Sequence, residues 1–531
     1  MNSSRRKFLQ QLGLGVGAFA FFSPGQRAAI AAASAALPRS TPEAEGISSA
    51  AILAFLEASA QSTNELHSFM MARHGSVISE GWWAPYSAEL RHTMYSMSKS
   101  FTSTAVGFAV AEGKLRVNDR VVSYFPKDLP DQVSDNLAAL RVKDLLTMSV
   151  GNEKEPTGTV IKEENWVRTF LAQPITHTPG STFLYNSVAT YMCSAIVQHL
   201  VGEKIVDYLR PRLFEPLGIE GVSWETCPRG INTGGWGLGI QTEGLAKFGQ
   251  LYLQKGQWHG RQLLPEAWVE EATTFKIQQP EPVKPTRPKE QNDWLQGYCY
   301  QFWRCQHHGF RGDGAFGQYT IVLPEQDVVI AMTSEGKDMQ GQLDLVWEHL
   351  LPAMKDAPLP ADPATQTRLN EKLSSLALAI PKGQRTSPTS DRISGKVFQV
   401  EANEFGVESA AFAFEKDACK VTLRAGAAAH AITCGIERWE RGTTALPGTP
   451  PRLIVGGIAP AGTAYPLVAS GTWKDDNTFE MTWRFFETPH HLTITCKFDA
   501  ETVQIAFVSS IGKMNGILKS DKPVLRGKLT A

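Results

Sequence analysis

The sequence predicts an α+β domain, in which helices flank an antiparallel sheet, followed by an all-β domain that is a barrel or a sandwich. Three observations support this prediction. Helix and hairpin patterns are mixed over residues 37–357, proline, alanine, threonine and serine dominate residues 358–391, and short alternating strands follow over residues 392–531. We therefore expect two folded domains joined by a linker over residues 358–391.

Residues 1–36 have the pattern of an export signal. Arg5 and Arg6 stand just before an apolar stretch over residues 12–22, and residues 33–35 (Ala-Ser-Ala) provide a cleavage site. The twin arginine resembles a Tat-type signal, which exports folded proteins. The alternative is a membrane anchor, but the stretch is short for a bilayer and rich in glycine. We therefore predict a periplasmic or secreted protein without a stable membrane span.

Strand and helix patterns alternate within the α+β domain. Hairpin strands are indicated by apolar and β-branched runs on either side of turn residues, and helices by apolar residues at helical spacing that end at glycine. The predicted elements are a hairpin over residues 68–80 that turns at 74–75, helices over 100–112 and 188–200, and two strands over 318–334 that turn at 324–327.

The C-terminal region has the alternation of half-buried strands. A turn over residues 474–477 precedes the strand predicted over 478–485, and further strands are predicted over 492–498 and 503–507. Several short strands separated by turns are typical of a sandwich or a small barrel. No catalytic set is recognisable there, so we expect an accessory domain.

The composition and the pattern of cysteines and histidines limit the ligands that we expect. The 52 Lys and Arg residues nearly balance the 53 Asp and Glu residues, so nucleic acid is not an expected partner. We expect a small-molecule or peptide-like substrate, and leave the oligomeric state open. The seven cysteines form no CxxC pair and the histidines no HExxH motif, so no cofactor and no metal are expected. A disulfide among Cys419, Cys434 and Cys496 is possible.

The candidate nucleophile is Ser96, with Lys99 three residues later. At the start of a helix these two side chains lie one turn apart on the same face. A serine hydroxyl needs a neighbouring base, and a buried lysine with a lowered pKa can serve. The spacing alone is weak evidence, because Ser510 and Lys513 also fit it at the predicted end of a strand, and because an N-cap serine with a solvated lysine is common.

Two further segments support Ser96. Tyr185, followed by Asn186 and Ser187, stands at a predicted helix start and could relay a proton, although a lone tyrosine is more often core. Residues 311–319 lead into a strand, and their glycines could let a substrate backbone approach closely, unless they simply form a tight turn.

Ser96 to Lys99, with Ser-Phe-Thr after it, resembles the first motif of class C β-lactamases and related penicillin-recognising hydrolases. The likeness covers roughly residues 45–350, and four further runs resemble that family in its order: residues 113–121, 142–151, 234–239 and 245–251. The resemblance implies a β-lactamase/transpeptidase-like fold and an acyl-enzyme. Ser96 would attack a carbonyl, Lys99 would be the general base, and Tyr185 would share the proton transfers. Backbone N–H groups of Ser96 and of a residue near Phe316 and Gly317 would hold the oxyanion.

The sequence departs from the family at two motifs. The second is usually Tyr-x-Asn, so either Ser187 takes the place of the amide or Asn186 reaches in from a shifted position. The third is usually Lys-Thr-Gly or His-x-Gly, and here Asp313 and Gly314 stand in it, with residues 307–309 (His-His-Gly) as a competing alignment. Loss of the cation that would hold a β-lactam carboxylate argues against β-lactamase activity.

The pattern is similar to the esterase and oligoamide-hydrolase branch, and an amine-bearing substrate would suit Asp313. We therefore predict an exported serine hydrolase that cleaves an ester or amide. Two alternatives remain: a catalytically silent binding or sensor protein on the same fold, and a D-Ala peptidase that acts on cell-wall peptides.

Overall fold

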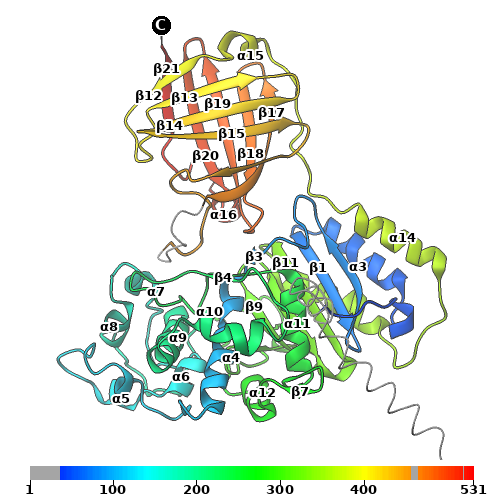
Figure 1. Cartoon of the computed structure of the whole chain (residues 1–531), viewed down its shortest axis with the longest axis vertical. Coiled ribbons are helices and arrows are strands. Elements are labelled where there is room, and N and C mark those ends of the chain that lie inside the picture. The colour runs from blue at the N-terminus through cyan, green and yellow to red at the C-terminus, as the bar shows by residue number, and fades with distance from the viewer. Residues whose placement is uncertain (1–35, 456–463, 518, 531) are drawn as a thin grey trace, which may run out of the picture.

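The computed structural model describes residues 36–455, 464–517 and 519–530, which form two units. A domain of mixed helices and sheet lies below a β-barrel (Figure 1). The predicted export signal lies outside the described residues, except for Ala36. In the described ranges no helix is long and apolar enough to cross a membrane. The predicted fold class is confirmed, and the C-terminal all-β domain is a barrel rather than a sandwich.

The first domain is built on a six-stranded antiparallel sheet in the order β2-β1-β11-β10-β9-β8. Nearly every residue of the central strands is buried, because helices cover both faces of the sheet. The predicted hairpin over residues 68–80 and the strand pair over 318–334 are both present. The strands are β1 (Glu65–Arg73), β2 (Ser76–Trp82), β8 (Trp303–Arg304), β9 (Phe310–Gly314), β10 (Gln318–Leu323) and β11 (Val328–Glu335).

The predicted helices over residues 100–112 and 188–200 are α4 and α9, which pack against each other in the core of this domain. Most side chains of α4 are buried, since it runs through the middle of the helical region (Figure 1). The helices are α3 (Ser49–Gln61), α4 (Ser98–Ala111), α5 (Asp135–Ala139), α6 (Val142–Leu146), α7 (Thr157–Val160), α8 (Trp166–Leu171), α9 (Ser187–Val201), α10 (Ile205–Leu209), α11 (Thr242–Leu253), α12 (Glu266–Thr273) and α13 (Met339–Leu345).

Two small sheets complete the domain. One brings β3 and β4 to either side of β5, and thereby carries the chain to the turn that begins at Met94. The other is the hairpin of β6 and β7. Their strands are β3 (His92–Thr93), β4 (Ser223–Trp224), β5 (Leu238–Ile240), β6 (Gln257–Trp258) and β7 (Arg261–Gln262).

The segment predicted as a linker is ordered and packed. Helix α14 (Pro363–Ser374) lies against α3 and β2, and buries Leu369 in their apolar cluster. Further along, the backbone of Gln384 exchanges two hydrogen bonds with Trp473 of the barrel. Helix α15 (Pro388–Ile393) then leads into the first barrel strand. The segment therefore contacts both domains.

The C-terminal domain is a closed barrel of nine strands. Neighbouring strands are antiparallel, and a short parallel pairing of β15 with β17 closes the ring. Strand β16 pairs with β17 outside the ring. Aromatic side chains fill the interior, among them Trp473 and Trp483. The strands are β12 (Val397–Val400), β13 (Ser409–Phe414), β14 (Ala418–Ala425), β15 (Ala428–Ile436), β16 (Glu440–Thr444), β17 (Tyr465–Asp475), β18 (Thr478–Arg484), β19 (His491–Asp499), β20 (Thr502–Ser509) and β21 (Leu525–Leu529), with the short helix α16 (Ser510–Met514) after β20.

All seven cysteines are buried and unpaired, although Cys419 and Cys434 stand opposite each other on β14 and β15. The possible disulfide is therefore absent from this structure.

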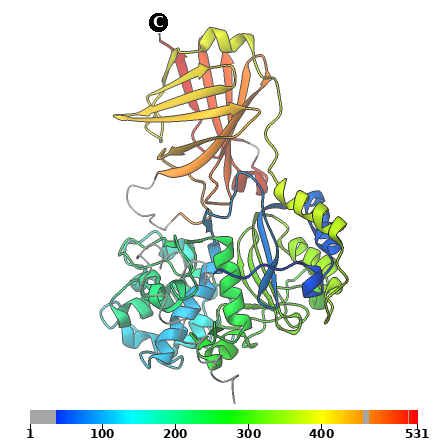
Figure 2. The same cartoon turned by 45° about the vertical axis from the view of Figure 1, so that its right-hand side comes forward.

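The barrel docks on the first domain through the turn between β18 and β19. Within residues 485–490, the carbonyl of Glu487 accepts a hydrogen bond from the Thr93 N–H (3.0 Å), and that of Thr488 accepts one from the Tyr86 hydroxyl (3.0 Å). Arg484, at the end of β18, forms an ion pair with Glu65 at the start of β1 (2.7 Å). These contacts join the barrel to the start of β1 and to the segment that runs from β2 to β3. Figure 2 shows the barrel above the first domain from a second side.

Candidate active site

Ser96 lies in a tight turn at the N-terminal end of α4. The turn spans Tyr95–Met97, and Tyr95 has φ 46°, a left-handed conformation that is uncommon for a residue other than glycine. The Met94 N–H donates to the carbonyl of Leu238 in β5 (2.8 Å), and this bond ties the turn to the small sheet. The backbone thus presents Ser96 at the start of the helix that carries Lys99.

Lys99 is buried beside Ser96. Its Nζ lies 3.1 Å from Oγ of Ser96, 3.1 Å from Oγ of Ser187 and 2.7 Å from the carbonyl oxygen of Gly235. A carbonyl can only accept a hydrogen bond, so one amine hydrogen is committed to Gly235. A neutral amine in this position can donate to Gly235 and Ser187 and accept the proton of Ser96, which is the arrangement that a general base needs.

The electrostatic surroundings of Lys99 favour its neutral form. Burial lowers the pKa of Lys99 to about 7, although the carboxylates of Glu155 and Asp313 oppose the shift. Among the described residues no acidic group forms an ion pair with Lys99 that would hold its charge. A substantial fraction of the lysine is therefore uncharged near neutral pH.

The second motif brings Tyr185 and Ser187 to the site. The centre of the Tyr185 ring lies 4.9 Å from Nζ of Lys99, and the ring stacks on that of Trp303 with an interplanar angle of 24°. Burial raises the pKa of Tyr185, and a hydrogen bond with Ser96 only partly offsets this. The phenol is therefore protonated and next to Ser96, where it can pass a proton.

Asn186 does not reach Lys99. Its side chain caps α9, where Oδ1 accepts from the Ala189 N–H (3.0 Å), and its amide donates to Asn152 (3.2 Å). Of the two residues considered from the sequence, Ser187 is the one whose side chain contacts Lys99. The reason is local: a helix that starts at Ser187 requires Asn186 as its cap.

The glycines of the third motif lie directly against atoms of the turn that carries Ser96. A Cβ atom at Gly312 would lie 2.2 Å from Sδ of Met97, and one at Gly314 would lie 2.2 Å from the carbonyl oxygen of Met94. The sequence argument expected them to admit a substrate backbone. Instead, they let β9 pack directly against the turn that carries Ser96.

Asp313 is paired with a residue that the sequence analysis did not single out. Its Oδ2 accepts from Nε of the fully buried Arg311 (2.9 Å), whose guanidinium lies over the Trp294 ring. Burial raises the pKa of Asp313 to about 6, against the opposing effect of Arg311. The other oxygen, Oδ1, makes no hydrogen bond within the described residues. The carboxylate of Asp313 is also near enough to Lys99 to raise the pKa of that lysine.

The competing alignment at residues 307–309 lies at the other end of β9. His308 is exposed and pairs with Glu325 (2.8 Å), and the His307 ring lies against Trp347. The β9 end that adjoins the Ser96 turn is the one with Asp313 and Gly314.

Phe316 and Gly317 shape the turn after β9 rather than meeting Ser96. The Gly317 N–H donates to the Gly314 carbonyl (3.1 Å), so it is already used and cannot be the expected oxyanion donor. The Phe316 ring lies 5.4 Å from that of Tyr95 and 4.8 Å from that of His490. Phe316 therefore packs against Tyr95, the residue before Ser96, and Gly317 stabilises the turn after β9.

Two further groups at the site had no assigned role in the sequence analysis. The carbonyl of Gly235 lies in a glycine-rich run that the family resemblance had marked without a function. Glu155 accepts a hydrogen bond from the Ser187 N–H at the start of α9 (3.2 Å) and one from the Thr157 hydroxyl. Nothing in the local sequence around Glu155 signals this role, because it depends on how two loops meet.

The second serine–lysine pair is not assembled. Contrary to expectation, Ser510 does begin a short helix, α16, but its hydroxyl donates to Oε1 of Glu335 (2.5 Å). Lys513 donates to Thr493 instead (2.6 Å). The spacing alone therefore does not make a nucleophile.

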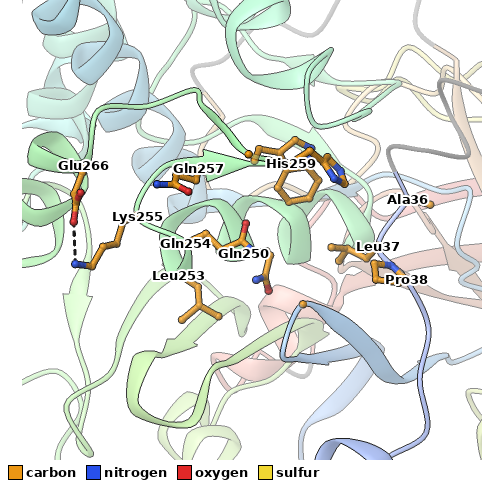
Figure 3. Close-up of a pocket in the computed structure, with 13 residues that line it drawn as sticks. Ala36, Leu37, Pro38, Gln250, Leu253, Gln254, Lys255, Gln257, His259 and Glu266 are labelled. Carbon is orange, nitrogen blue, oxygen red and sulfur yellow. Dashed lines mark hydrogen bonds and ion pairs between the residues drawn. The ribbon is translucent and has the colours of Figure 1, made fainter. Parts of the chain in front are cut away.

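We also considered a cavity away from Ser96 and possible metal-binding groups. A cavity of about 660 Å³ lies between α11 and the β6–β7 hairpin, and is lined by residues such as Gln250, Gln254 and His259, with the Lys255–Glu266 ion pair at one side (Figure 3). It contains none of the predicted site residues. In the part of the chain that the structure describes, no group of three or more His, Cys, Asp or Glu residues is arranged to hold a metal ion.

The family model described as "Beta-lactamase" matches residues 67–351. The 6-aminohexanoate-dimer hydrolase of Paenarthrobacter ureafaciens is 24% identical over 289 residues, which cover 51% of this chain and 72% of that protein. A predicted D-alanyl-D-alanine carboxypeptidase of Escherichia coli (strain K12) is 26% identical over 142 residues, 24% of this chain and 33% of that protein.

Among solved structures, the octameric penicillin-binding protein homologue from Pyrococcus abyssi is similar to this chain. It covers 90% of this chain and 99% of its own, with 14% identity and a TM-score of 0.45.

Proposed function

Because the chain belongs to the beta-lactamase family and is a serine hydrolase, we propose that it cleaves an ester or amide bond through an acyl-enzyme on Ser96. The observation that carries this proposal is the contact of the buried Lys99 Nζ with Oγ of Ser96, at 3.1 Å. The pKa of Lys99, lowered to about 7, makes it a base suited to neutral pH.

The proposed acylation follows from these contacts. Neutral Lys99 takes the proton of the Ser96 hydroxyl while Oγ attacks the substrate carbonyl carbon. The carbonyl oxygen becomes an oxyanion, which the Ser96 N–H at the start of α4 and a backbone N–H at the end of β9 stabilise. The proton then passes to the leaving amine or alcohol, through Lys99 or the neighbouring Tyr185 phenol, as the bond to the leaving group breaks.

Deacylation uses the same groups in reverse roles. Water takes the position of the departed group and gives a proton to neutral Lys99, directly or through the Tyr185 phenol as a relay, as its oxygen attacks the acyl carbon. The bond to Oγ then breaks, and Oγ recovers a proton.

We propose an amine-bearing substrate for this site. Asp313 and Glu155 place two carboxyl groups near Lys99, and both raise the pKa of Lys99. Oδ1 of Asp313 makes no hydrogen bond to any residue that the structure describes. A substrate ammonium group would be attracted there and a substrate carboxylate repelled. The chain is similar to a protein named 6-aminohexanoate-dimer hydrolase, and the compound in that name contains an amine as well as a carboxylate.

The test of the nucleophile is a mass spectrum of the mature protein after brief exposure to a fluorophosphonate and to activated esters. We expect one adduct on Ser96, turnover of esters, and neither in Ser96→Ala. Absence of an adduct on the unaltered protein would contradict the proposal and favour a silent binding protein on this fold. A labelled penicillin added in parallel tests for a D-Ala peptidase, which the similarity to the predicted carboxypeptidase suggests.

The proposed hydrolase is exported in folded form. The support is the twin arginine, Arg5 and Arg6, before an apolar stretch. Cell fractionation is the test: we expect the protein in the periplasm or medium, and the Arg5→Lys/Arg6→Lys double variant in the cytoplasm. Unaltered protein that stays in the cytoplasm would contradict export.

A further inference from the structure

The barrel contributes one side chain to the back of the candidate active site. His490 comes from the turn that follows β18, and it is fully buried where the two domains meet. Its Nε2 lies 2.5 Å from the hydroxyl of Tyr95, the residue immediately before Ser96. A residue 395 positions along the chain thus contacts the nucleophile turn.

The same histidine is anchored from its other side by Glu335. Nδ1 of His490 lies 2.5 Å from Oε1 of Glu335, at the end of β11. A carboxylate only accepts hydrogen bonds, so Nδ1 donates and the ring orientation is fixed. Hydrogen bonds from His490 and His491 hold the pKa of Glu335 well below its usual range. Glu335 is therefore ionised, and it holds His490 as a carboxylate holds an oriented imidazole.

Tyr95 is a position where such support matters. Its φ of 46° lies in the left-handed region, and this conformation costs free energy for any residue other than glycine. The conformation persists only where the surroundings hold it, and the direction of Ser96 depends on it. Its hydroxyl bond to His490 and its ring contact with Phe316 provide that support.

His490 also contacts the second half of the site. Its ring meets that of Phe316 edge-on at 4.8 Å, and Phe316 lies in the turn directly after Gly314 and Ala315. The end of β9, where we place one oxyanion donor, is therefore supported by the same imidazole. One side chain of the barrel thus contacts the turns on both sides of the attacked carbonyl.

We infer that His490, oriented by Glu335, is a positioning residue that sets the Ser96 turn through the hydroxyl of Tyr95. This assigns the barrel a part in the reaction: docking of the barrel completes the support of the nucleophile. The inference rests on the proposed function of Ser96, since it concerns the geometry of acylation.

The test separates the two contacts of His490. The amide of an asparagine can reach the place of Nδ1 and keep Glu335, but it is too short for Tyr95. The amide of a glutamine can reach the place of Nε2 and keep Tyr95, while Glu335 retains its bonds to His491 and Ser510. The variants are therefore His490→Asn, His490→Gln, Tyr95→Phe and the double variant of His490→Asn with Tyr95→Phe.

His491→Gln is the matched control. His491 is the next residue and bonds to the same carboxylate (3.2 Å), but among the described residues it has no hydrogen bond or ring contact with Tyr95. The measurement is the rate of fluorophosphonate labelling of Ser96 and, for an activated ester, kcat and KM separately. Thermal melting monitors folding, and Tyr95→Phe, which removes a single oxygen atom, decides the matter if a histidine variant does not fold.

We expect His490→Asn and Tyr95→Phe each to slow labelling about tenfold, through kcat rather than KM, because the turn loses its alignment. The double variant should be no slower than either single one, His490→Gln should recover most of the rate, and His491→Gln should match the unaltered protein. Unchanged labelling in Tyr95→Phe and His490→Asn, or effects that multiply, would overturn the inference alone. Absence of labelling in the unaltered protein would overturn the proposed function and this inference with it.

Discussion

Nζ of Lys99 lies 2.7 Å from the carbonyl oxygen of Gly235, a contact between residues 136 positions apart. The carbonyl fixes the direction of the amine without supplying a full negative charge. A carboxylate in its place would hold the lysine protonated, and a protonated lysine cannot accept the proton of Ser96. The choice of a carbonyl as partner thus keeps Lys99 available as a base.

Replacement of Lys99 should abolish most of the reactivity of Ser96. We expect Lys99→Met to lower the fluorophosphonate labelling rate by about 10²- to 10⁴-fold, the usual contribution of a general base. Lys513→Met is the control, because Lys513 stands at the same spacing from Ser510 but donates to Thr493. Labelling of Lys99→Met at the same rate as Lys513→Met would remove Lys99 from the mechanism.

The rate of acylation should rise with pH. Burial lowers the pKa of Lys99 to about 7, and only the neutral amine can take the proton of Ser96. The labelling rate should therefore be low at pH 5, half-maximal near pH 7 and level at higher pH. A rate that keeps rising towards pH 10 would show instead that the lysine retains an ordinary pKa. The measurement is labelling against pH with an uncharged probe, which does not itself titrate.

The charge of Asp313 should determine selectivity for amine-bearing substrates. Its pKa is raised to about 6, so the carboxylate is charged above that pH and progressively neutral below it. We expect kcat/KM for an ester with an ammonium group, relative to a neutral ester of the same size, to rise as pH passes 6. In Asp313→Asn that ratio should fall about tenfold and lose this pH dependence.

The same substitution should also move the pH profile of acylation. The carboxylate of Asp313 raises the pKa of Lys99, so its removal should shift the half-maximal labelling rate to lower pH. Equal ratios for the two esters in both proteins would exclude Asp313 as a specificity residue.

Gly314 should tolerate no side chain. A Cβ there would lie 2.2 Å from the carbonyl oxygen of Met94, so Gly314→Ala must displace the turn that carries Ser96. We expect labelling to slow by about 10- to 100-fold, since displacements of about 1 Å are costly in catalysis. Gly442→Ala in β16 is the control, because the space around its Cβ is open. Equal labelling rates for the two variants would show that the close packing of β9 on the turn does not affect the reactivity of Ser96.

The parts of the site that could be predicted from the sequence are the local ones. Ser96 and Lys99 are three residues apart in a helical turn that continues directly into α4, so their contact follows from helix geometry. Ser510 and Lys513 show the limit of that argument, since the same spacing gives no contact where Glu335 and Thr493 compete for the two side chains.

The remaining site features depend on contacts between distant segments. The carbonyl of Gly235, the pairing of Asp313 with Arg311 and the place of His490 all follow from the tertiary fold, and no local pattern specifies them. The choice of Ser187 over Asn186 required the exact first residue of α9. Likewise, alternation of strands predicted an all-β domain, but closure into a barrel depends on a parallel pairing of only two residue pairs between β15 and β17.

The contact between the two domains should weaken as pH falls. His67 and His92 are buried with their rings hydrogen-bonded to each other (Nδ1 to Nε2, 3.0 Å), and His67 also bonds to Glu65, the partner of Arg484 on the barrel. Burial lowers the pKa of both histidines below their usual value of 6.5. The unfolded chain therefore binds protons that the folded protein does not, and stability is lost as pH falls below 6.5.

Glu65 acts in the same direction at lower pH. Arg484 and His67 together lower its pKa to about 2 despite its burial, so its contribution is present above pH 4.5 and lost as pH falls towards 2. We expect the melting temperature to decline from pH 7 to 5 through the histidines and again below pH 4.5 through Glu65. The His67→Gln/His92→Gln double variant should melt with a flatter dependence between pH 7 and 5 but keep the decline below pH 4.5. Identical slopes between pH 7 and 5 in the two proteins would show that this pair does not control the acid sensitivity of the interface.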